Sequence, residues 1–303
     1  MAVKPREEGQ TTALVSLRAL LPDLRPSERR IAELFLSAPE STAELAIAQL
    51  AELSDTSTTS VIRLCKRLGY KGFKDLRLDV LREVTRESYE TAGLPAVPSD
   101  IDRADSLEDV VAKVSLAETL SISDTAKVLD TASLRRAADA VSAAARVDIF
   151  GVGASSVVGE DLQQKLVRIG RTALRWPDAH AAWTAAATLH AGNVAVALSH
   201  SGATVDTLEF DELASAAGAT TIAITNHATS PVAQAADIVL TTAARETGFR
   251  SGALGSRIAQ LMVVDCLFIG VAQADYDASM EAIRGTYATI QRLNRRRRES
   301  RRP

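Results

Sequence analysis

The chain has 303 residues, of which 46% are hydrophobic, and its formal net charge is −3 at pH 7. That length and apolar content are sufficient for two domains with separate cores. Cys65 and Cys266 are too few for a disulfide framework, and the four histidines lack metal-ligand spacing, so neither a metal nor a cofactor is expected. The opening residues are polar, and Asp265 interrupts the most apolar late stretch, which predicts a cytoplasmic protein with no membrane partner.

The charges are unevenly distributed along the chain. Residues 60–82 are strongly basic and contain only two carboxylates, Asp75 and Asp79, whereas acidic residues outnumber basic ones over 107–285. The end of the chain, RLNRRRRESRR, is basic again. A basic segment in an acidic chain fits a nucleic-acid backbone, because Lys and Arg release condensed counterions from phosphates. A solvated helix face would give the same pattern.

The first ninety residues read as short helices without strand-like alternation. Pro26 opens one helix, and the capping-box pattern at Ser41 predicts the start of another. After a break at Asp55, Ser57 caps a third helix that ends at Gly69. The apolar stripe of this third helix consists of Val61, Leu64, Cys65 and Leu68. Short helices joined by a tight turn predict a helix-turn-helix domain over residues 1–88.

A change of composition divides the chain after this domain. Gly93, Pro95 and Pro98 prevent regular structure, which predicts a linker over 89–106. A second domain is expected over 107–285, followed by a basic tail over 286–303.

The second domain is predicted to be a doubly wound α/β fold with a parallel sheet. Helical patterns cover 107–129 and 133–144. Apolar runs then alternate with amphipathic helices, as buried parallel strands with crossover helices require. The predicted strands are 147–151, 193–198, 220–225 and 237–241, and the clearest helices among them are 161–169 and 206–217.

Two loops at the carboxyl ends of the predicted strands are candidates for ligand binding. In open parallel sheets ligands lie beyond these ends. Small residues and hydroxyls that lead into a helix N-terminus are suited to a phosphate group. Glycines at 151, 153 and 159 do not have the dinucleotide spacing, so a nicotinamide cofactor is not expected. The candidate residues are Gly153, Ala154, Ser155, Ser156, Ser199, His200, Ser201, Gly202 and Thr204.

The sequence resembles the RpiR-type regulators in both halves. Residues 24–84, with PSERRI, SVIRLCKRLG and Gly72-Phe73, resemble their DNA-binding domain. Residues 147–272, with IFGVGASS, ALSHSGAT, IAITNHATSPVAQAADIVL and ETGFRSGALGSRIAQL, resemble their sugar isomerase (SIS) domain. The resemblance implies a repressor or activator that is controlled by a phosphosugar, often from amino-sugar or pentose metabolism. It also implies that Glu246 lies near the sugar hydroxyls.

The chain departs from the usual pattern of these regulators at two positions. Asp55 and Thr56 stand where Gly and an apolar residue are usual, and Asp tolerates the left-handed conformation of such a turn. Arg25 stands where a Ser or Thr cap is usual, so fraying is expected at the start of that helix.

The helix from Ser57 is the expected recognition helix. Burial of its apolar stripe leaves polar residues outside, and such residues read base edges or hold phosphates. Arg63 is the best candidate for a guanine contact, because its guanidinium matches the O6 and N7 acceptors. The expected DNA-binding residues are Thr59, Ser60, Arg63, Lys66, Arg67, Lys71 and Lys74.

An enzyme is the alternative: a phosphosugar isomerase or lyase with an accessory helical domain. Isomerisation requires a general base, for which Glu246, Glu160 or His200 could serve. The basic recognition helix favours a regulator without enzymatic activity. Because paired half-sites lie roughly 34–36 Å apart, a homodimer or homotetramer is expected, with residues 107–144 and Ala253 to Ala274 as its interface.

Overall fold

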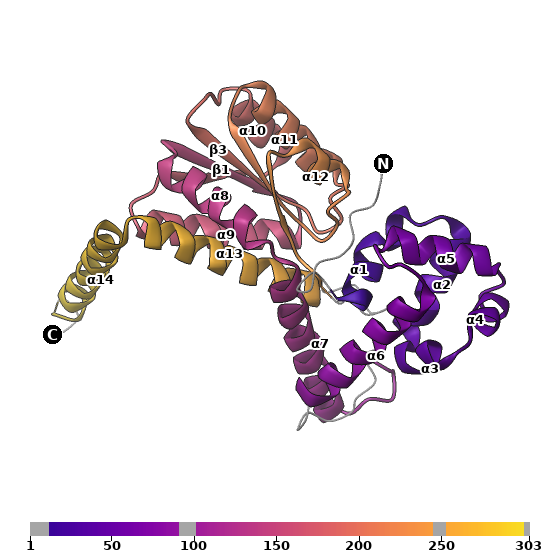
Figure 1. The fold of residues 1–303 in the computed structure, drawn as a ribbon. Helices are drawn as coiled ribbons and strands as arrows, with labels where there is room; N and C mark the ends of the chain where they lie inside the picture. The colour runs from indigo at the N-terminus through magenta and orange to yellow at the C-terminus, as the bar shows by residue number, and fades with distance from the viewer. Residues whose placement is uncertain (1–11, 91–100, 245–252, 300–303) are drawn as a thin grey trace. The chain divides into compact units, whose positions relative to one another are not determined.

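The computed structural model describes residues 12–90, 101–244 and 253–299. By its internal contacts the chain divides into two compact units (Figure 1). The first consists of Met1–Val128 with Ala243–Gly255, and the second of Leu129–Thr242 with Ser256–Pro303. The sequence-based boundary at residue 107 assigns the next helix to the second domain, whereas its contacts group it with the first unit. The domain boundaries stay a prediction.

The described part of the first unit is helical, as the sequence predicts. One core joins its helices up to residue 90, with Ile31, Phe35, Leu50, Leu64 and Leu76 fully buried. The helices are α1 (Ala13–Leu20), η1 (Leu21–Asp23), α2 (Pro26–Ser37), α3 (Pro39–Glu44), α4 (Ile47–Leu53), α5 (Thr58–Arg67), α6 (Phe73–Glu90) and α7 (Leu107–Val128).

The turn before α5 follows the expected local chemistry. Ser57 caps α5, because its hydroxyl accepts a hydrogen bond from the backbone N–H of Ser60 at 3.2 Å. Asp55 adopts the left-handed conformation, with φ 48°, so the turn forms without glycine. The prediction that Ser41 begins a helix is wrong: Ser41 lies inside α3, where its hydroxyl donates to the carbonyl of Ala38.

The second unit contains a five-stranded parallel sheet with the order β2-β1-β3-β4-β5. The four predicted strands are confirmed to within one residue at each end, but the short edge strand β2 is not predicted. Three residues of mixed polarity give no periodic signal. The strands are β1 (Arg146–Gly151), β2 (Ala173–Arg175), β3 (Asn193–Leu198), β4 (Thr220–Thr225) and β5 (Ile238–Thr241).

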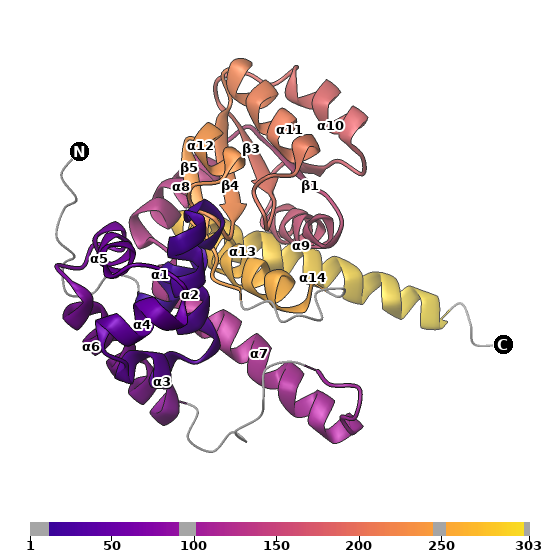
Figure 2. The ribbon, with the colours of Figure 1, turned by 90° about the vertical axis from the view of Figure 1, so that its right-hand side faces the viewer.

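Helices cover both faces of this sheet, and the alternation of side chains along each strand supplies two cores (Figures 1 and 2). Ile149, Val196 and Leu198 point to one face, whereas Phe150 and Ala197 point to the other. The first face packs against α8 (Thr131–Ala143), α9 (Ala154–Arg168) and α13 (Leu254–Ala274). The second face packs against α10 (Ala179–Ala186), α11 (Val205–Ala216) and α12 (Pro231–Ala235).

The two C-terminal helices differ in their packing. Among the described residues, α13 alone has the length and hydropathy to cross a membrane, but Val263, Val264 and Leu267 lie in the core of the second unit. Only 44% of its apolar window is buried within the chain. The helix α14 (Tyr276–Glu299) includes most of the segment expected as a basic tail.

A buried carboxylate on α11 couples stability to pH. Asp211 is inaccessible to solvent, and neither of its carboxylate oxygens has a hydrogen-bond partner among the residues that the structure describes. Burial, with the nearby charges of Asp237 and Glu212, raises the pKa of Asp211 from 3.8 to about 7. The folded chain therefore binds a proton that the unfolded chain has released, and the free energy of unfolding falls as the pH rises through this window.

We predict that Asp211→Asn raises the free energy of unfolding at about pH 8, by on the order of 3 kcal/mol, because it removes a buried charge. At about pH 4 the Asp211 carboxyl is protonated, and the variant should match the parent chain. Denaturant titrations at both pH values measure this, with Glu209→Gln, which changes an exposed carboxylate on the same helix, as control. Equal effects of Asp211→Asn at both pH values would contradict the account.

Candidate effector site and DNA-binding surface

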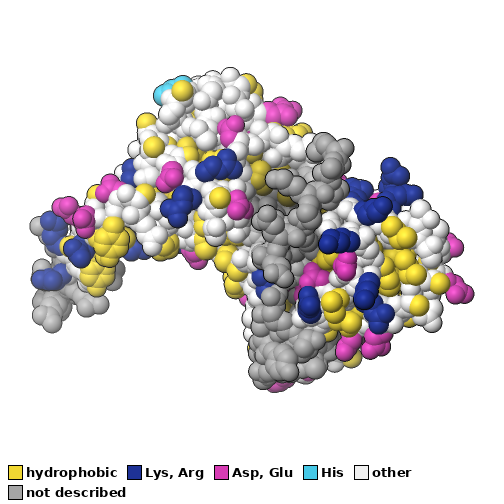
Figure 3. All heavy atoms as spheres, viewed as in Figure 1, with side chains coloured by type: hydrophobic (Ala, Val, Ile, Leu, Met, Phe, Trp, Pro, Cys, Tyr) yellow, Lys and Arg dark blue, Asp and Glu magenta, His cyan; other side chains and the backbone are white. Residues whose placement is uncertain are grey.

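The outer face of α5 carries most of the residues expected to bind DNA. Thr59, Arg63 and Lys66 are exposed, and Lys71 and Lys74 are exposed in the following turn and at the start of α6. Figure 3 shows several Lys and Arg side chains over the visible face of the first unit. These side chains are thus accessible from solvent, as contact with a nucleic acid requires.

Ser60 does not lie on that face, and the prediction that it does is wrong. Only 8% of Ser60 is exposed, and its hydroxyl lies 3.2 Å from that of Ser57. The reason is helical periodicity: Ser60 precedes Leu64 by four residues, so both side chains lie on the inner stripe.

Arg67 is exposed but engaged within the unit. Its guanidinium donates to the carboxylate of Glu28 at 3.3 Å and to the carbonyl of Asp23 at 2.9 Å. Glu28 is buried, and its other contact is with the backbone N–H of Arg25, the cap position of α2. Arg67 therefore holds the end of α5 against the start of α2, a role that the outer-face pattern did not reveal. The Glu28 contact also compensates for the missing Ser or Thr cap.

In the second unit, the two candidate loops are neighbours because β1 and β3 pair side by side. A Cβ atom at Gly151 would lie 2.8 Å from the carbonyl oxygen of Leu198, so only glycine permits this approach. Gly153 follows with φ 63° and forms the N-terminal boundary of α9. The residues Gly153 to Ser156 and Ser199 to Thr204 thus begin at adjacent strand ends.

The loop from Ser199 to Thr204 is held by its own polar groups. The buried Ser199 hydroxyl accepts a hydrogen bond from the N–H of Gly202 at 3.0 Å and lies 3.1 Å from that of Thr204. Gly202 has φ 62°, and a Cβ atom there would lie 2.0 Å from the hydroxyl oxygen of Ser230. The loop is therefore a tight turn that leads directly into α11. The first N–H groups of a helix have no partner within it, so this end favours an anion.

The remaining candidate residues of the two loops make local contacts. The hydroxyl of Ser201 accepts from the N–H of Ala203 at 3.3 Å, and that of Ser156 donates to the carbonyl of Gly153 at 2.8 Å. The ring of His200 lies edge-on to that of His227, with 5.9 Å between their centroids. Ala154 is the first residue of α9. Glu246 lies outside the described residues.

Gln260 is a residue of this region that the sequence reasoning missed. Its side-chain oxygen accepts a hydrogen bond from the hydroxyl of Ser155 at 3.2 Å, and both residues are buried. The amide nitrogen of Gln260 has no partner within the described chain. An amide within the otherwise apolar run 258–264 of α13 is the signal that could have identified it, because buried polar groups are normally paired.

A chain of polar contacts within the first unit links α7 to α1. Arg18 donates to the buried carboxylate of Asp124 at 3.0 Å. The next residue, Thr125, is also buried, and its hydroxyl accepts a hydrogen bond from the N–H of Ala243 at 3.1 Å. Ala243 immediately precedes the segment that contains Glu246.

Glu83 fixes the other side of α1. Its carboxylate accepts from the hydroxyl of Thr12 at 2.6 Å and from the N–H of Leu14 at 2.9 Å, and so caps this helix. Burial raises the pKa of Glu83, and the bonds from Thr12 and Leu14 oppose that increase. Helices α1, α6 and α7 are thus joined by two buried carboxylates.

Two family models match the chain. Residues 11–87 match the helix-turn-helix domain of the rpiR family, and residues 141–270 match the SIS domain. The chain is 37% identical over 276 residues to an uncharacterized HTH-type transcriptional regulator of Caldanaerobacter subterraneus, covering 91% of this chain and 96% of that protein. It is 33% identical to the uncharacterized HTH-type transcriptional regulator YbbH of Bacillus subtilis, covering 93% and 98%.

A solved structure has the same architecture. The Vibrio vulnificus NanR protein complexed with ManNAc-6P is 28% identical to the chain, with a TM-score of 0.58, and the match covers 93% of this chain and 98% of that one. The expected order of a helical domain followed by an SIS-type α/β domain is confirmed. The relatives are transcriptional regulators, so the isomerase alternative is set aside. The chain belongs to the rpiR family of helix-turn-helix transcriptional regulators with an SIS domain.

Proposed function

We propose that this regulator binds an operator through α5 and that a phosphosugar in its SIS domain controls this binding. The observation that carries the proposal is the loop from Ser199 to Thr204. It combines hydroxyls, a left-handed glycine and a helix N-terminus at one strand end. Those are the groups that a phosphate monoester requires. The NanR protein, with ManNAc-6P bound, makes an N-acetylated amino-sugar phosphate the first effector to test.

The proposed roles within the loop follow from its hydrogen bonds. Ser199 is buried and engaged with Gly202, so its main role is to hold the turn. Ser201 and Thr204 are partly exposed and can direct their hydroxyls to the phosphate oxygens. Ser155, at the start of α9 after the neighbouring strand β1, and its partner Gln260 on α13 are suited to the sugar. By resemblance, Glu246 is proposed to contact sugar hydroxyls.

The proposed DNA contacts are divided into base reading and phosphate binding. Arg63, exposed in the middle of α5, is the candidate for a base edge, with Thr59 beside it. Lys66, Lys71 and Lys74 are proposed to contact phosphates. We further propose that the regulator is cytoplasmic and binds its operator as a homodimer or homotetramer, since one recognition helix covers only a few base pairs.

The series of polar contacts from Ala243 through α7 to α1 is the proposed route by which the effector changes operator binding. An effector that moves the segment after Ala243 would displace Thr125 and, with it, the neighbouring Asp124. Asp124 is paired with Arg18 on α1, and α1 is capped by Glu83 of α6. Coupling between effector binding and operator binding requires an element with two alternative arrangements. Helix α7 is the candidate, because it contacts both α1 and Ala243.

The phosphate prediction concerns Ser201. We expect Ser201→Ala to weaken binding of N-acetylmannosamine 6-phosphate by about 10- to 100-fold, because a hydrogen bond to a charged group contributes about 1.5–3 kcal/mol. The fold should be unaffected, since the hydroxyl of Ser201 makes only a local turn contact. Calorimetry with the phosphorylated and the unphosphorylated sugar measures this, and Ser215→Ala, on the exposed end of α11, is the control. Equal affinity for the two sugars would refute the phosphate role of the loop.

The DNA prediction compares Arg63 with Lys71. Arg63→Ala should cost about 1–3 kcal/mol on the operator and relax the preference at one base position, because a bidentate base contact is lost. Lys71→Ala should weaken specific and scrambled DNA alike and reduce the salt slope by about one, because a phosphate contact is independent of sequence. Binding titrations at several salt concentrations separate the two. A uniform loss in Arg63→Ala would make it a phosphate contact instead.

The coupling prediction concerns Thr125. Thr125→Val keeps the shape of the side chain but removes the acceptor for the N–H of Ala243. The variant should bind operator and effector separately as the parent does, while the effector changes its operator affinity less. Thr119→Val on the same helix is the matched control, because the Thr119 hydroxyl also donates to a carbonyl four residues earlier but is exposed. An unchanged effector response in Thr125→Val would exclude this route.

A further inference from the structure

The second half of α14 presents an apolar stripe to solvent. Up to Ile283 the helix packs against the core of the second unit, but every described residue from Arg284 to Arg295 is exposed. Tyr287, Ile290 and Leu293 are 62%, 57% and 46% exposed, and their spacing of three residues aligns them on one side of the helix. Figure 3 shows hydrophobic side chains along this helix. Large apolar side chains in such a row mark an interaction surface.

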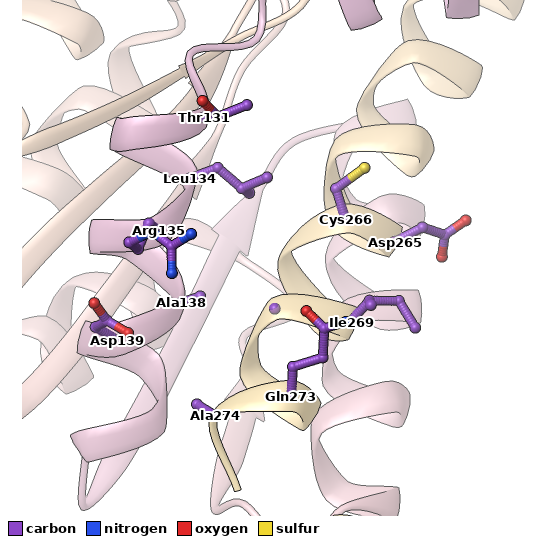
Figure 4. Close-up of a pocket in the computed structure, with 11 residues that line it drawn as sticks. Thr131, Leu134, Arg135, Ala138, Asp139, Asp265, Cys266, Ile269, Gln273 and Ala274 are labelled. Atoms are coloured by element: carbon purple, nitrogen blue, oxygen red, sulfur yellow. The ribbon is translucent and has the colours of Figure 1, made fainter. Parts of the chain in front are cut away.

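The same unit contains a groove that none of the described residues of its own chain occupies. The groove lies between α8 and α13, has a volume of about 580 Å³ and is open to solvent (Figure 4). Ile269 on its wall is 51% exposed, and Ala138 and Gly270 let the two helices approach closely at its floor. Its other lining residues are Thr131, Leu134, Arg135, Asp139, Asp265, Cys266, Gln273 and Ala274.

We propose that α14 of one copy lies in the groove between α8 and α13 of a second copy, and that the exchange is reciprocal. The proposal deepens the expected homo-oligomer by naming the surface that forms it. One chain cannot fill its own groove, because α14 begins at Tyr276, directly beyond the groove residue Ala274, and packs on α9 as it leads away (Figure 1). A reciprocal exchange closes with two-fold symmetry and leaves neither apolar surface in water.

Length and burial support this occupant. The exposed residues of α14 from Gly285 to Arg295 form a helical segment of about 16 Å, which fits along α8, about 20 Å long at 1.5 Å per residue. On α14, Arg292 and Arg295 lie on the side opposite the apolar stripe and Arg284 lies at its flank, so these charges would stay in solvent while the stripe enters the groove. The exchange would also cover the part of α13 that its own chain leaves exposed.

The test compares two variants of the full chain that introduce the same charge on opposite sides of α14. Ile290→Glu places a carboxylate on the apolar stripe, and Ala288→Glu places one on the opposite side. Neither side chain is buried in its own chain, so both variants should fold with the parent's thermal unfolding. Sedimentation at micromolar concentration measures the oligomeric state. The rate at which a maleimide modifies Cys266 measures access to the groove.

Modification by a maleimide reports specifically on Cys266, because Cys65, the other cysteine, should not react. Cys65 is completely buried, and burial raises its pKa to about 12. Cys266 is partly exposed within one chain and lines the groove. We expect the parent and Ala288→Glu to sediment as dimers or tetramers with a protected Cys266. Ile290→Glu should sediment as a smaller species, and its Cys266 should react at least tenfold faster.

Three results would overturn the proposal. One is an Ile290→Glu variant that keeps both the oligomer and the protection of Cys266. Another is a smaller species with unchanged Cys266 reactivity, which would mean that α14 pairs elsewhere, for example with the α14 of the second copy. The third is a monomeric parent chain. These outcomes are independent of effector binding, because a thermal shift with N-acetylmannosamine 6-phosphate reports on the loop from Ser199 to Thr204 and not on α14.

Discussion

The close approach of β1 and β3 at their carboxyl ends is the constraint on which the candidate effector site depends. Gly151 has no side chain, so the carbonyl of Leu198 can lie against its backbone. The two following loops therefore begin side by side, and each leads into the N-terminus of a helix. A methyl group at Gly151 would separate the strands and with them the hydroxyls of Ser155 and Ser199. The close packing of β1 and β3 therefore brings the two loops together, and the side chains of the loops then determine what they can bind.

Regulation requires that a small ligand alter a remote surface. In this chain, buried carboxylates that join α1, α6 and α7 could transmit such a change. Asp124 and Glu83 are buried carboxylates whose partners lie on another helix, so each is costly to separate from its partner. Because these contacts are costly to break, a displacement of α7 is expected to move α1 with it. Adjacent residues of α7 contact α1 on one side and Ala243 on the other, which makes α7 the natural element to transmit an effector-dependent change.

Much of this architecture could be predicted from the sequence, because its strongest signals are periodic. The buried strands, the Ser57 cap and the left-handed Asp55 each follow from one local rule. The outward position predicted for Ser60 is wrong because a small hydroxyl is compatible with either face of a helix, and the spacing of four residues to Leu64 places it inside. Contacts between distant residues could not be predicted: the pair of Arg67 with Glu28, the pair of Ser155 with Gln260 and the chain from Arg18 to Ala243 join segments that no local pattern relates.

The central claim is that sugar-phosphate binding and operator binding are thermodynamically coupled in one chain. The most direct measurement is a closed cycle, in which the Kd for operator DNA is determined with and without saturating N-acetylmannosamine 6-phosphate, and the Kd for the sugar phosphate with and without operator. Coupling requires both ratios to change by the same factor, which for allosteric proteins is typically about 5- to 150-fold. We expect equal factors that differ clearly from one. A sugar phosphate that binds tightly but leaves the operator affinity unchanged would contradict the account.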